Sequence, residues 1–233
     1  MLFEHFEDRR MLAQVHWLLD TDGSWEVPEN WSTGSVPGSS DDVIIDRGAA
    51  NPVITINSGE QLIRSLKSTE AMTLVGGILT VEQTLLVSNT VTLAGGTLKD
   101  ATVVTGTELV LTAAGGTLDS VTVNGDLDLS QVSGVNVSIA HNLVLNGTMY
   151  IGHANGSTYG TVYFGDYSAA SEMLSGSATV VFGRHSSNAF YYWNGTAGTL
   201  TLAPTVTIRG KSGLLSSYWG RWNHHQPGHD RRG

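Results

Sequence analysis

The chain has 233 residues, of which 28 are glycine and none is cysteine, and 14% of its residues are charged. Its formal net charge is −9, from 12 Lys and Arg against 21 Asp and Glu, so its field repels phosphate and argues against a nucleic-acid partner. The absence of cysteine excludes a disulfide framework and a thiolate metal site. Because no run of about 18 apolar residues occurs, the sequence predicts no membrane span.

Residues 1–20 form the first predicted segment, a short helix that covers the start of the following array. Apolar residues recur three and four positions apart from Phe3 to Leu19, as on one face of a helix. Charged residues stand where a standard signal peptide has its apolar core. Residues 6–13, Phe-Glu-Asp-Arg-Arg-Met-Leu-Ala, resemble the LEPR-XLL-type motif near the start of many large bacterial extracellular proteins. This resemblance implies an extracellular or cell-surface location, and a chain that is a fragment of a larger gene product.

Residues 21–42 form a lead-in segment rich in Trp and Pro, in which Trp25 and Trp31 are expected to cover the first coil of the array. This segment resembles the lead-in to β-solenoid regions of bacterial surface proteins. Three acidic residues near its end offer the several oxygens that Ca²⁺ requires, namely Asp41, Asp42 and Asp46. The simpler interpretation is that these carboxylates cap turns, with no metal bound.

Residues 43–213 show internal repetition. The segment 95–103 (Gly-Gly-Thr-Leu-Lys-Asp-Ala-Thr-Val) is followed 20 residues later by a similar one at 115–123, and self-similarity at a fixed period indicates a repeat architecture. Within each period lie short triads such as Val121-Thr122-Val123. Their period-two alternation predicts strands with the outer two side chains inward and the middle one outward.

These features predict an all-β fold, a single-stranded right-handed parallel β-helix with coils of about 20 residues. The hand follows the general preference of parallel crossovers, and a twisted antiparallel sandwich is the alternative. The repeated Gly pairs (76–77, 95–96 and 115–116) and the Asn-Gly pairs at Gly125 and Gly147 are expected at corners with positive φ. Segments such as 116–130 and 199–213 resemble coils of large bacterial extracellular β-helix proteins.

Aromatic residues accumulate after Tyr159. Two similar segments, 162–165 and 180–183, lie 18 residues apart, so Phe164 and Phe182 are expected to point inward and stack on each other. Other aromatic side chains are expected to face outward on adjacent coils and form a platform for the apolar faces of sugar rings. The candidate ligand-binding residues are Tyr163, Tyr167, Tyr191, Tyr192 and Trp193. The alternative is that these rings cover a loop or fill the interior.

A pair of carboxylates offers a catalytic alternative. Asp126 and Asp128 lie two positions apart on one predicted strand, so their side chains share a face at about 7 Å. That separation falls in the range used by glycoside hydrolases, but the favoured interpretation is a solvated face without a catalytic role. Lys99 and Asp119 occupy equivalent places on successive coils and are expected to form a surface ion pair.

Residues 214–233 lack a strand period and are expected to form an irregular or disordered tail. The favoured function is that of a non-enzymatic extracellular or cell-surface β-helix with a structural or adhesive role, binding a polysaccharide or cell-surface glycan without a cofactor. The alternative is a polysaccharide lyase or glycoside hydrolase that uses the Asp126 and Asp128 carboxylates, and a third reading is a non-functional fragment. An uncovered last coil would expose strand edges and invite end-to-end self-association.

Overall fold

The computed structural model describes residues 14–166, 171–193 and 198–217. Among these residues the only helices are two short 3₁₀ turns, η1 (Pro28–Asn30) and η2 (Gly48–Ala50). The described strands form one sheet of 15 strands and one of nine, and every pairing between them is parallel. The predicted all-β class is confirmed, and the antiparallel sandwich is wrong.

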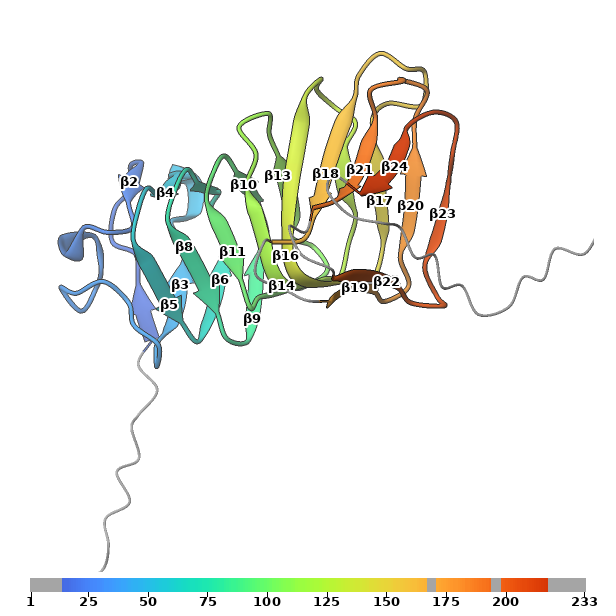
Figure 1. Ribbon diagram of the computed structural model, residues 1–233. Helices are drawn as coiled ribbons and strands as arrows, with labels where there is room; N and C mark the ends of the chain where they lie inside the picture. Colours follow the sequence, from blue (N-terminus) through green and yellow to red (C-terminus); the bar gives the residue numbers. More distant parts are fainter. Residues whose placement is uncertain (1–13, 167–170, 194–197, 218–233) are drawn as a thin grey trace, which may run out of the picture.

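The strands stand side by side along one axis, from the N-terminal to the C-terminal end of the described chain (Figure 1). The nine-stranded sheet contains, in order, β2 (Gly23–Ser24), β4 (Ile54–Ile56), β7 (Met72–Leu74), β10 (Thr90–Leu93), β13 (Glu108–Leu111), β15 (Leu127–Leu129), β17 (Thr148–Ile151), β20 (Thr179–Phe182) and β23 (Thr207–Gly210).

The 15-stranded sheet consists of two rows that share the long strands β14 (Thr117–Val123) and β16 (Val135–Leu145). Row 1 contains β5 (Glu60–Ile63), β8 (Ile78–Val81), β11 (Thr97–Lys99), the first parts of β14 and β16, β18 (Gly160–Phe164), β21 (Ala189–Tyr192) and β24 (Leu214–Ser217). Row 2 contains β1 (Gln14–His16), β3 (Asp42–Ile45), β6 (Ser65–Ser68), β9 (Thr84–Val87), β12 (Thr102–Val103), the last parts of β14 and β16, β19 (Ser171–Ser175) and β22 (Thr199–Leu202).

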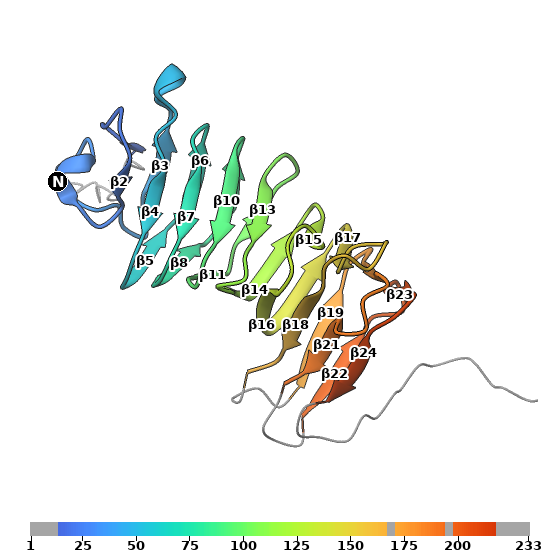
Figure 2. The same ribbon diagram turned by 90° about the horizontal axis from the view of Figure 1, so that it is seen from above.

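The chain visits the nine-stranded sheet, row 1 and row 2 in turn, and we call one such passage a coil. For example, β10, β11 and β12 make one coil, after which β13 returns to pair with β10. Seen from above, the strands of successive coils lie next to one another along the axis (Figure 2). This order of parallel pairings is consistent with the predicted β-helix.

The core follows from the alternation within each strand. In β10, Val91 and Leu93 are buried, whereas Thr90 and Thr92 face outward. Successive coils repeat this pattern, so one apolar cluster extends from Val15 to Phe190 through the described residues. Full burial of one such side chain stabilises the fold by about 1.5–3 kcal/mol.

The corners of the coils do not match the expectation from the Asn-Gly pairs. Neither Gly125 nor Gly147 has a positive φ. Left-handed backbone occurs at the repeated Gly pairs, as predicted, where φ is 67° at Gly77, 121° at Gly95 and 79° at Gly115. It also occurs at three non-glycine residues between rows 1 and 2, where φ is 52° at Asp100, 55° at Ser120 and 60° at His141. These residues lie at corresponding corners of three successive coils, where the chain bends from one row into the next.

The predicted N-terminal helix is wrong for residues 14–19. Gln14–His16 form strand β1, which pairs with β3, and Val15 and Trp17 are buried while His16 is exposed. The backbone of β1 hydrogen-bonds to β3, and the period-two alternation buries Val15 and Trp17. These interactions outweigh the weak helical spacing. Residues 1–13, including the LEPR-XLL-type motif, lie outside the described residues.

The Trp- and Pro-rich segment covers the first coil, as predicted. Trp17, Trp25 and Trp31 are at most 1% exposed, with ring centroids 5.0 Å apart for Trp17 and Trp31 and 4.6 Å for Trp25 and Trp31. The indole N–H of Trp31 donates to the Trp25 carbonyl oxygen at 2.8 Å. At the other end, the prediction of an irregular tail is wrong for Leu214–Ser217, which form β24 and pair with β21.

The coils lengthen after Met149. Met72 pairs with Val91, 19 residues later, whereas Met149 pairs with Val180, 31 residues later. Segments 162–165 and 180–183, only 18 residues apart, therefore fall in different sheets. Phe164 and Phe182 both point inward, but they do not stack on each other as predicted. Phe164 stacks on Phe190 instead, with centroids 5.9 Å apart.

Candidate functional site

A pocket of about 420 Å³ lies on the outer surface of row 1, over β14, β16 and β18. Its described lining residues are Thr117, Ser138, Ala140, Tyr163, Gly165, Asp166 and Trp193. Thr117, Ser138 and Tyr163 are register partners on successive coils. The side chains are small on the first two of these coils and aromatic on the third, which leaves a hollow with an aromatic wall.

The wall consists of Tyr163 and Trp193, and Tyr191 packs beside Tyr163. Tyr163 of β18 stacks on its register partner Tyr191 of β21, with centroids 5.8 Å apart and ring planes 18° apart. The Trp193 ring meets Tyr163 edge-on at 5.4 Å. All three are half-buried, and the structure thus brings together three of the predicted ligand-binding residues.

Of the other two predicted aromatic residues, the structure describes only Tyr192, which is not part of this wall. Tyr192 lies on the inward side of β21 and is 7% exposed, because the alternation along β21 buries Phe190 and Tyr192 and leaves Tyr191 facing outward. Tyr167 lies outside the described residues.

A row of charged groups borders the pocket. The Lys99 ammonium lies 3.6 Å from Asp119, which confirms the predicted ion pair between successive coils. The other oxygen of Asp119 lies 2.6 Å from Nδ1 of His141, and Nε2 of His141 lies 3.6 Å from Asp166. The hydrogen bond to Asp119 raises the pKa of His141, assisted by the charges of Asp119, Asp166 and Glu172 and opposed by burial.

Glu172 is a buried carboxyl next to this row, only 2% exposed. Burial raises its pKa to about 7, since the charged form is poorly solvated there. Its Oε1 accepts a hydrogen bond from the backbone N–H of Asp166 at 3.2 Å, and its Oε2 is buried with no hydrogen-bond partner among the residues that the structure describes. Sequence reasoning missed this residue, although Glu172 occupies an inward position of β19, two residues before the buried Leu174.

The predicted catalytic pair, Asp126 and Asp128, lies elsewhere. Asp128 is on β15 of the nine-stranded sheet and Asp126 directly precedes that strand. Asp126 accepts a hydrogen bond from the backbone N–H of Thr148 at 2.7 Å, and Asp128 accepts one from the N–H of Ser130 at 2.7 Å. Neither carboxylate lines the pocket, and both stabilise local backbone.

The three aspartates considered for Ca²⁺ are engaged in separate contacts. Asp41 caps a turn through the Gly38 N–H at 2.8 Å, Asp42 is paired with Arg64 and Ser65, and Asp46 accepts from the Gly48 N–H at 3.3 Å. Over the described ranges, no group of three or more potential metal-ligating His, Asp or Glu side chains gathers.

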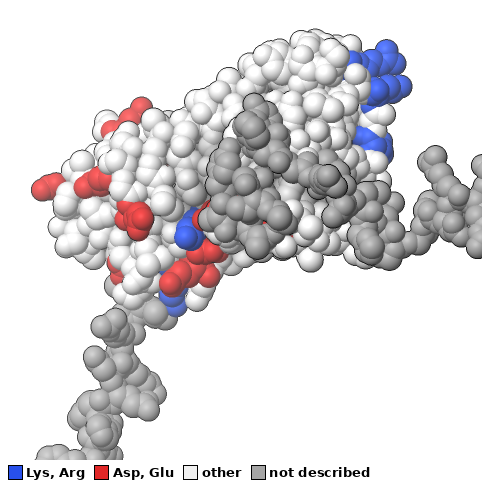
Figure 3. Space-filling view, in the orientation of Figure 1, with Lys and Arg blue, Asp and Glu red and all other residues white. Residues whose placement is uncertain are grey.

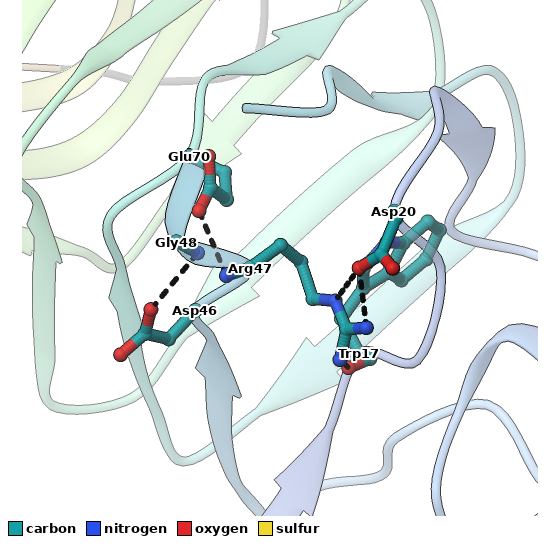
Figure 4. A network of polar contacts seen from close by, with 6 residues as sticks. All are labelled: Trp17, Asp20, Asp46, Arg47, Gly48 and Glu70. Atoms are coloured by element: carbon teal, nitrogen blue, oxygen red, sulfur yellow. Dashed lines mark hydrogen bonds and ion pairs between the residues drawn. The ribbon is translucent and has the colours of Figure 1, made fainter. Parts of the chain in front are cut away.

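The polar network beside Asp46 instead ties the first coils together (Figure 4). The Arg47 guanidinium donates through Nε to Asp20 at 2.8 Å, and its backbone N–H donates to Glu70 at 2.8 Å. Arg47 thus links Asp20, which follows β1, to Glu70 of a later coil.

Comparison with protein-family models gives no match. The searches of curated proteins and of solved structures give none either. In the part of the chain that the structure describes, no helix has the length and apolar character to cross a membrane.

Proposed function

We propose that this chain is a non-enzymatic structural or adhesive β-helix of the cell surface or extracellular space that binds glycan in the pocket walled by Tyr163 and Trp193. We further propose that its coils close into the right-handed, single-stranded helix expected from the sequence. The observation that carries the glycan proposal is the combination of aromatic wall, hydroxyl groups and carboxylate in one open pocket.

A sugar ring suits this combination of groups. Its C–H face is apolar and stacks on an aromatic ring, while its hydroxyls seek donors and acceptors. Thr117 and Ser138 contribute hydroxyls and Asp166 a carboxylate on the same surface as Tyr163 and Trp193. The volume of about 420 Å³ falls in the range of small-ligand sites.

The fold supports a spacer role for the same chain. Nine strands in parallel register at about 4.8 Å give an axis of about 38 Å, with one continuous core inside. Such a body is stiff, and it would hold the pocket at a fixed distance from whatever anchors its ends.

The test is titration of the full chain with a panel of neutral and charged oligosaccharides, followed by isothermal calorimetry or ligand-observed NMR. Loss of one stacking ring weakens binding by about 0.5–1.5 kcal/mol, so Trp193→Ala should lower affinity roughly 3- to 10-fold. The matched control is Tyr150→Ala, which removes an exposed ring from β17 in the nine-stranded sheet and should leave affinity unchanged. Equal affinity of Trp193→Ala and wild type would place any glycan elsewhere.

Glu172 supports a second candidate, a carbohydrate-active enzyme. A carboxyl with a pKa near 7 is protonated in part at neutral pH, which is the state that a general acid needs, and the ionisable Asp166 lies beside it. The test is to incubate the chain with a polysaccharide panel and assay for reducing ends and unsaturated products. Turnover lost in Glu172→Gln but kept in Asp128→Asn would establish this enzyme and overturn the non-enzymatic proposal.

A further inference from the structure

The two ends of the coil stack differ in how well their apolar residues are covered. Leu174, Val180 and Phe190 are fully buried. Their register partners one coil later are more exposed: Leu202 and Ile208 are half-buried and Leu215 is 40% exposed. The same inward positions are thus buried in one coil and partly exposed in the next. No further described coil packs against the last one to bury them.

The strands of this last coil also have one unpaired edge each among the described residues. β22, β23 and β24 each end their row or sheet, and each pairs with a single neighbour among the described strands. Such an edge offers unpaired N–H and C=O groups to another chain. Leu214, 48% exposed, adds to the apolar surface at this end.

The opposite end is covered in part. The outer side of the first strand of row 2 is occupied by residues 30–32: the N–H of Leu18 donates to the Asn30 carbonyl and the N–H of Ser32 to the His16 carbonyl, both at 2.9 Å. The buried tryptophans of the lead-in segment add to this cover. Row 1, in contrast, begins at β5, which pairs only with β8 among the described strands and leaves one strand edge open at this end.

The charges of the two ends are opposite. Residues 14–46 contain seven acidic residues and no Lys or Arg: Asp20, Asp22, Glu26, Glu29, Asp41, Asp42 and Asp46. Residues 173–217 contain Arg184, Arg209 and Lys211 and no acidic residue. Figure 3 shows acidic groups over the N-terminal coils and basic groups at the far end. Arg47 and Arg64 neutralise Asp20 and Asp42, which leaves the others to set the acidic field.

We propose that the open C-terminal coil docks onto the acidic N-terminal end of a second copy of this chain. Tail-to-tail contact would bring Arg209 and Lys211 against like charges, whereas head-to-tail contact pairs opposite fields. A head-to-tail contact uses two different surfaces, so it is repeatable and extends the rod instead of closing a dimer. This inference does not depend on the glycan pocket, which lies on the side of the stack.

The test is sedimentation velocity of the full chain over a wide range of concentration at 0.05 M and 1 M salt. We expect species larger than the monomer that grow with concentration, and an association at least 10-fold weaker at 1 M, where the Debye length falls to about 3 Å. Arg209→Glu/Lys211→Glu should abolish association. The control Glu108→Lys reverses an exposed charge mid-stack on β13 and should change association little.

The decisive arm uses complementary variants. Glu29→Lys/Asp46→Lys reverses exposed charges at the acidic end, so this variant alone should not assemble, while its mixture with Arg209→Glu/Lys211→Glu should. A monomer under all conditions would overturn the proposal. So would stronger association of Arg209→Glu/Lys211→Glu, which would indicate tail-to-tail contact. A monomer whose residues 218–233 resist proteolysis would indicate that this segment covers the last coil of its own chain, and it would also overturn the proposal.

Discussion

At the residue scale, two Asn-Gly pairs illustrate how identical local sequences meet different demands. A Cβ on Gly147 would overlap the carbonyl oxygen of Gly125 on the preceding coil, whereas a Cβ on Gly125 has nothing within 4 Å. Neither residue has positive φ, so the demand at Gly147 is for space and not for left-handed backbone.

Gly147→Ala should therefore destabilise the fold by about 2 kcal/mol or more, because two stacked backbones must move apart. Gly125→Ala, the matched control, should change the free energy of unfolding by less than about 1 kcal/mol. Urea unfolding monitored by circular dichroism measures both. A similar loss in the two variants would show that the close approach of the coils is absent.

The buried Glu172 makes stability depend on pH. Its pKa in the folded chain is about 7, above the ordinary 4.5, so between these values the folded state holds a proton that the unfolded state has released. Stability contributed by this group is full below pH 4.5 and falls as pH rises to about 7. His141 acts in the same direction, because its raised pKa means that stability is lost as pH rises above 6.5.

The free energy of unfolding should thus fall between pH 4.5 and 8, with up to about 3 kcal/mol coming from Glu172. Glu172→Gln keeps the neutral shape and should flatten most of this slope, leaving the part due to His141. Denaturant unfolding across this pH range tests the prediction. Parallel pH profiles for wild type and variant would contradict it.

At the element scale, the corners between rows 1 and 2 set the path of each coil. Ser120 interrupts β14 with φ 55° and its side chain is exposed, so its role is conformational. Asp100 and His141 perform the same bend on the neighbouring coils. Polar residues tolerate this region better than β-branched ones.

Ser120→Val should cost about 1–2 kcal/mol, since a β-branched side chain clashes in left-handed backbone, while Ser120→Gly should be neutral or slightly stabilising. Thermal unfolding of both variants beside wild type provides the measurement. Equal stability of the Val and Gly variants would mean that the corner is not held in this conformation.

Local alternation explains which strands could be predicted. Triads such as Val121-Thr122-Val123 appear as strands with their outer residues buried, because the period of two needs no long-range information. The same rule, applied to residues 189–192, would have separated the outward Tyr191 from the inward Tyr192. The N-terminal helix was mispredicted because pairing with β3, a tertiary interaction, decides the state of Gln14–His16.

The site was less accessible from sequence than the strands. The sequence identified Tyr163, Tyr191 and Trp193 as candidate ligand-binding residues, and the structure places their rings in contact. The contact of His141 with Asp119 and Asp166 joins residues more than 20 positions apart, and it depends on the register of coils whose length changes. No periodic signal marks where a coil lengthens, so the position-by-position alignment of later coils could not be derived.

At the scale of the whole molecule, the stack combines a partly covered acidic end, a continuous core and an open basic end. Parallel pairing from β1 to β24 means that each coil is stabilised mainly by its two neighbours. Defects introduced at one corner are therefore expected to affect adjacent coils more than distant ones.

The lengthening of coils after Met149 has a consequence for how this protein can vary. The extra residues, such as 153–158 and 184–187, are added between strands and are exposed or half-buried, while inward residues such as Ile151 and Val162 remain fully buried. The exposed loops can then be replaced without changing how the core packs. Grafting new loops at these two positions offers a route to altered recognition on an unaltered scaffold.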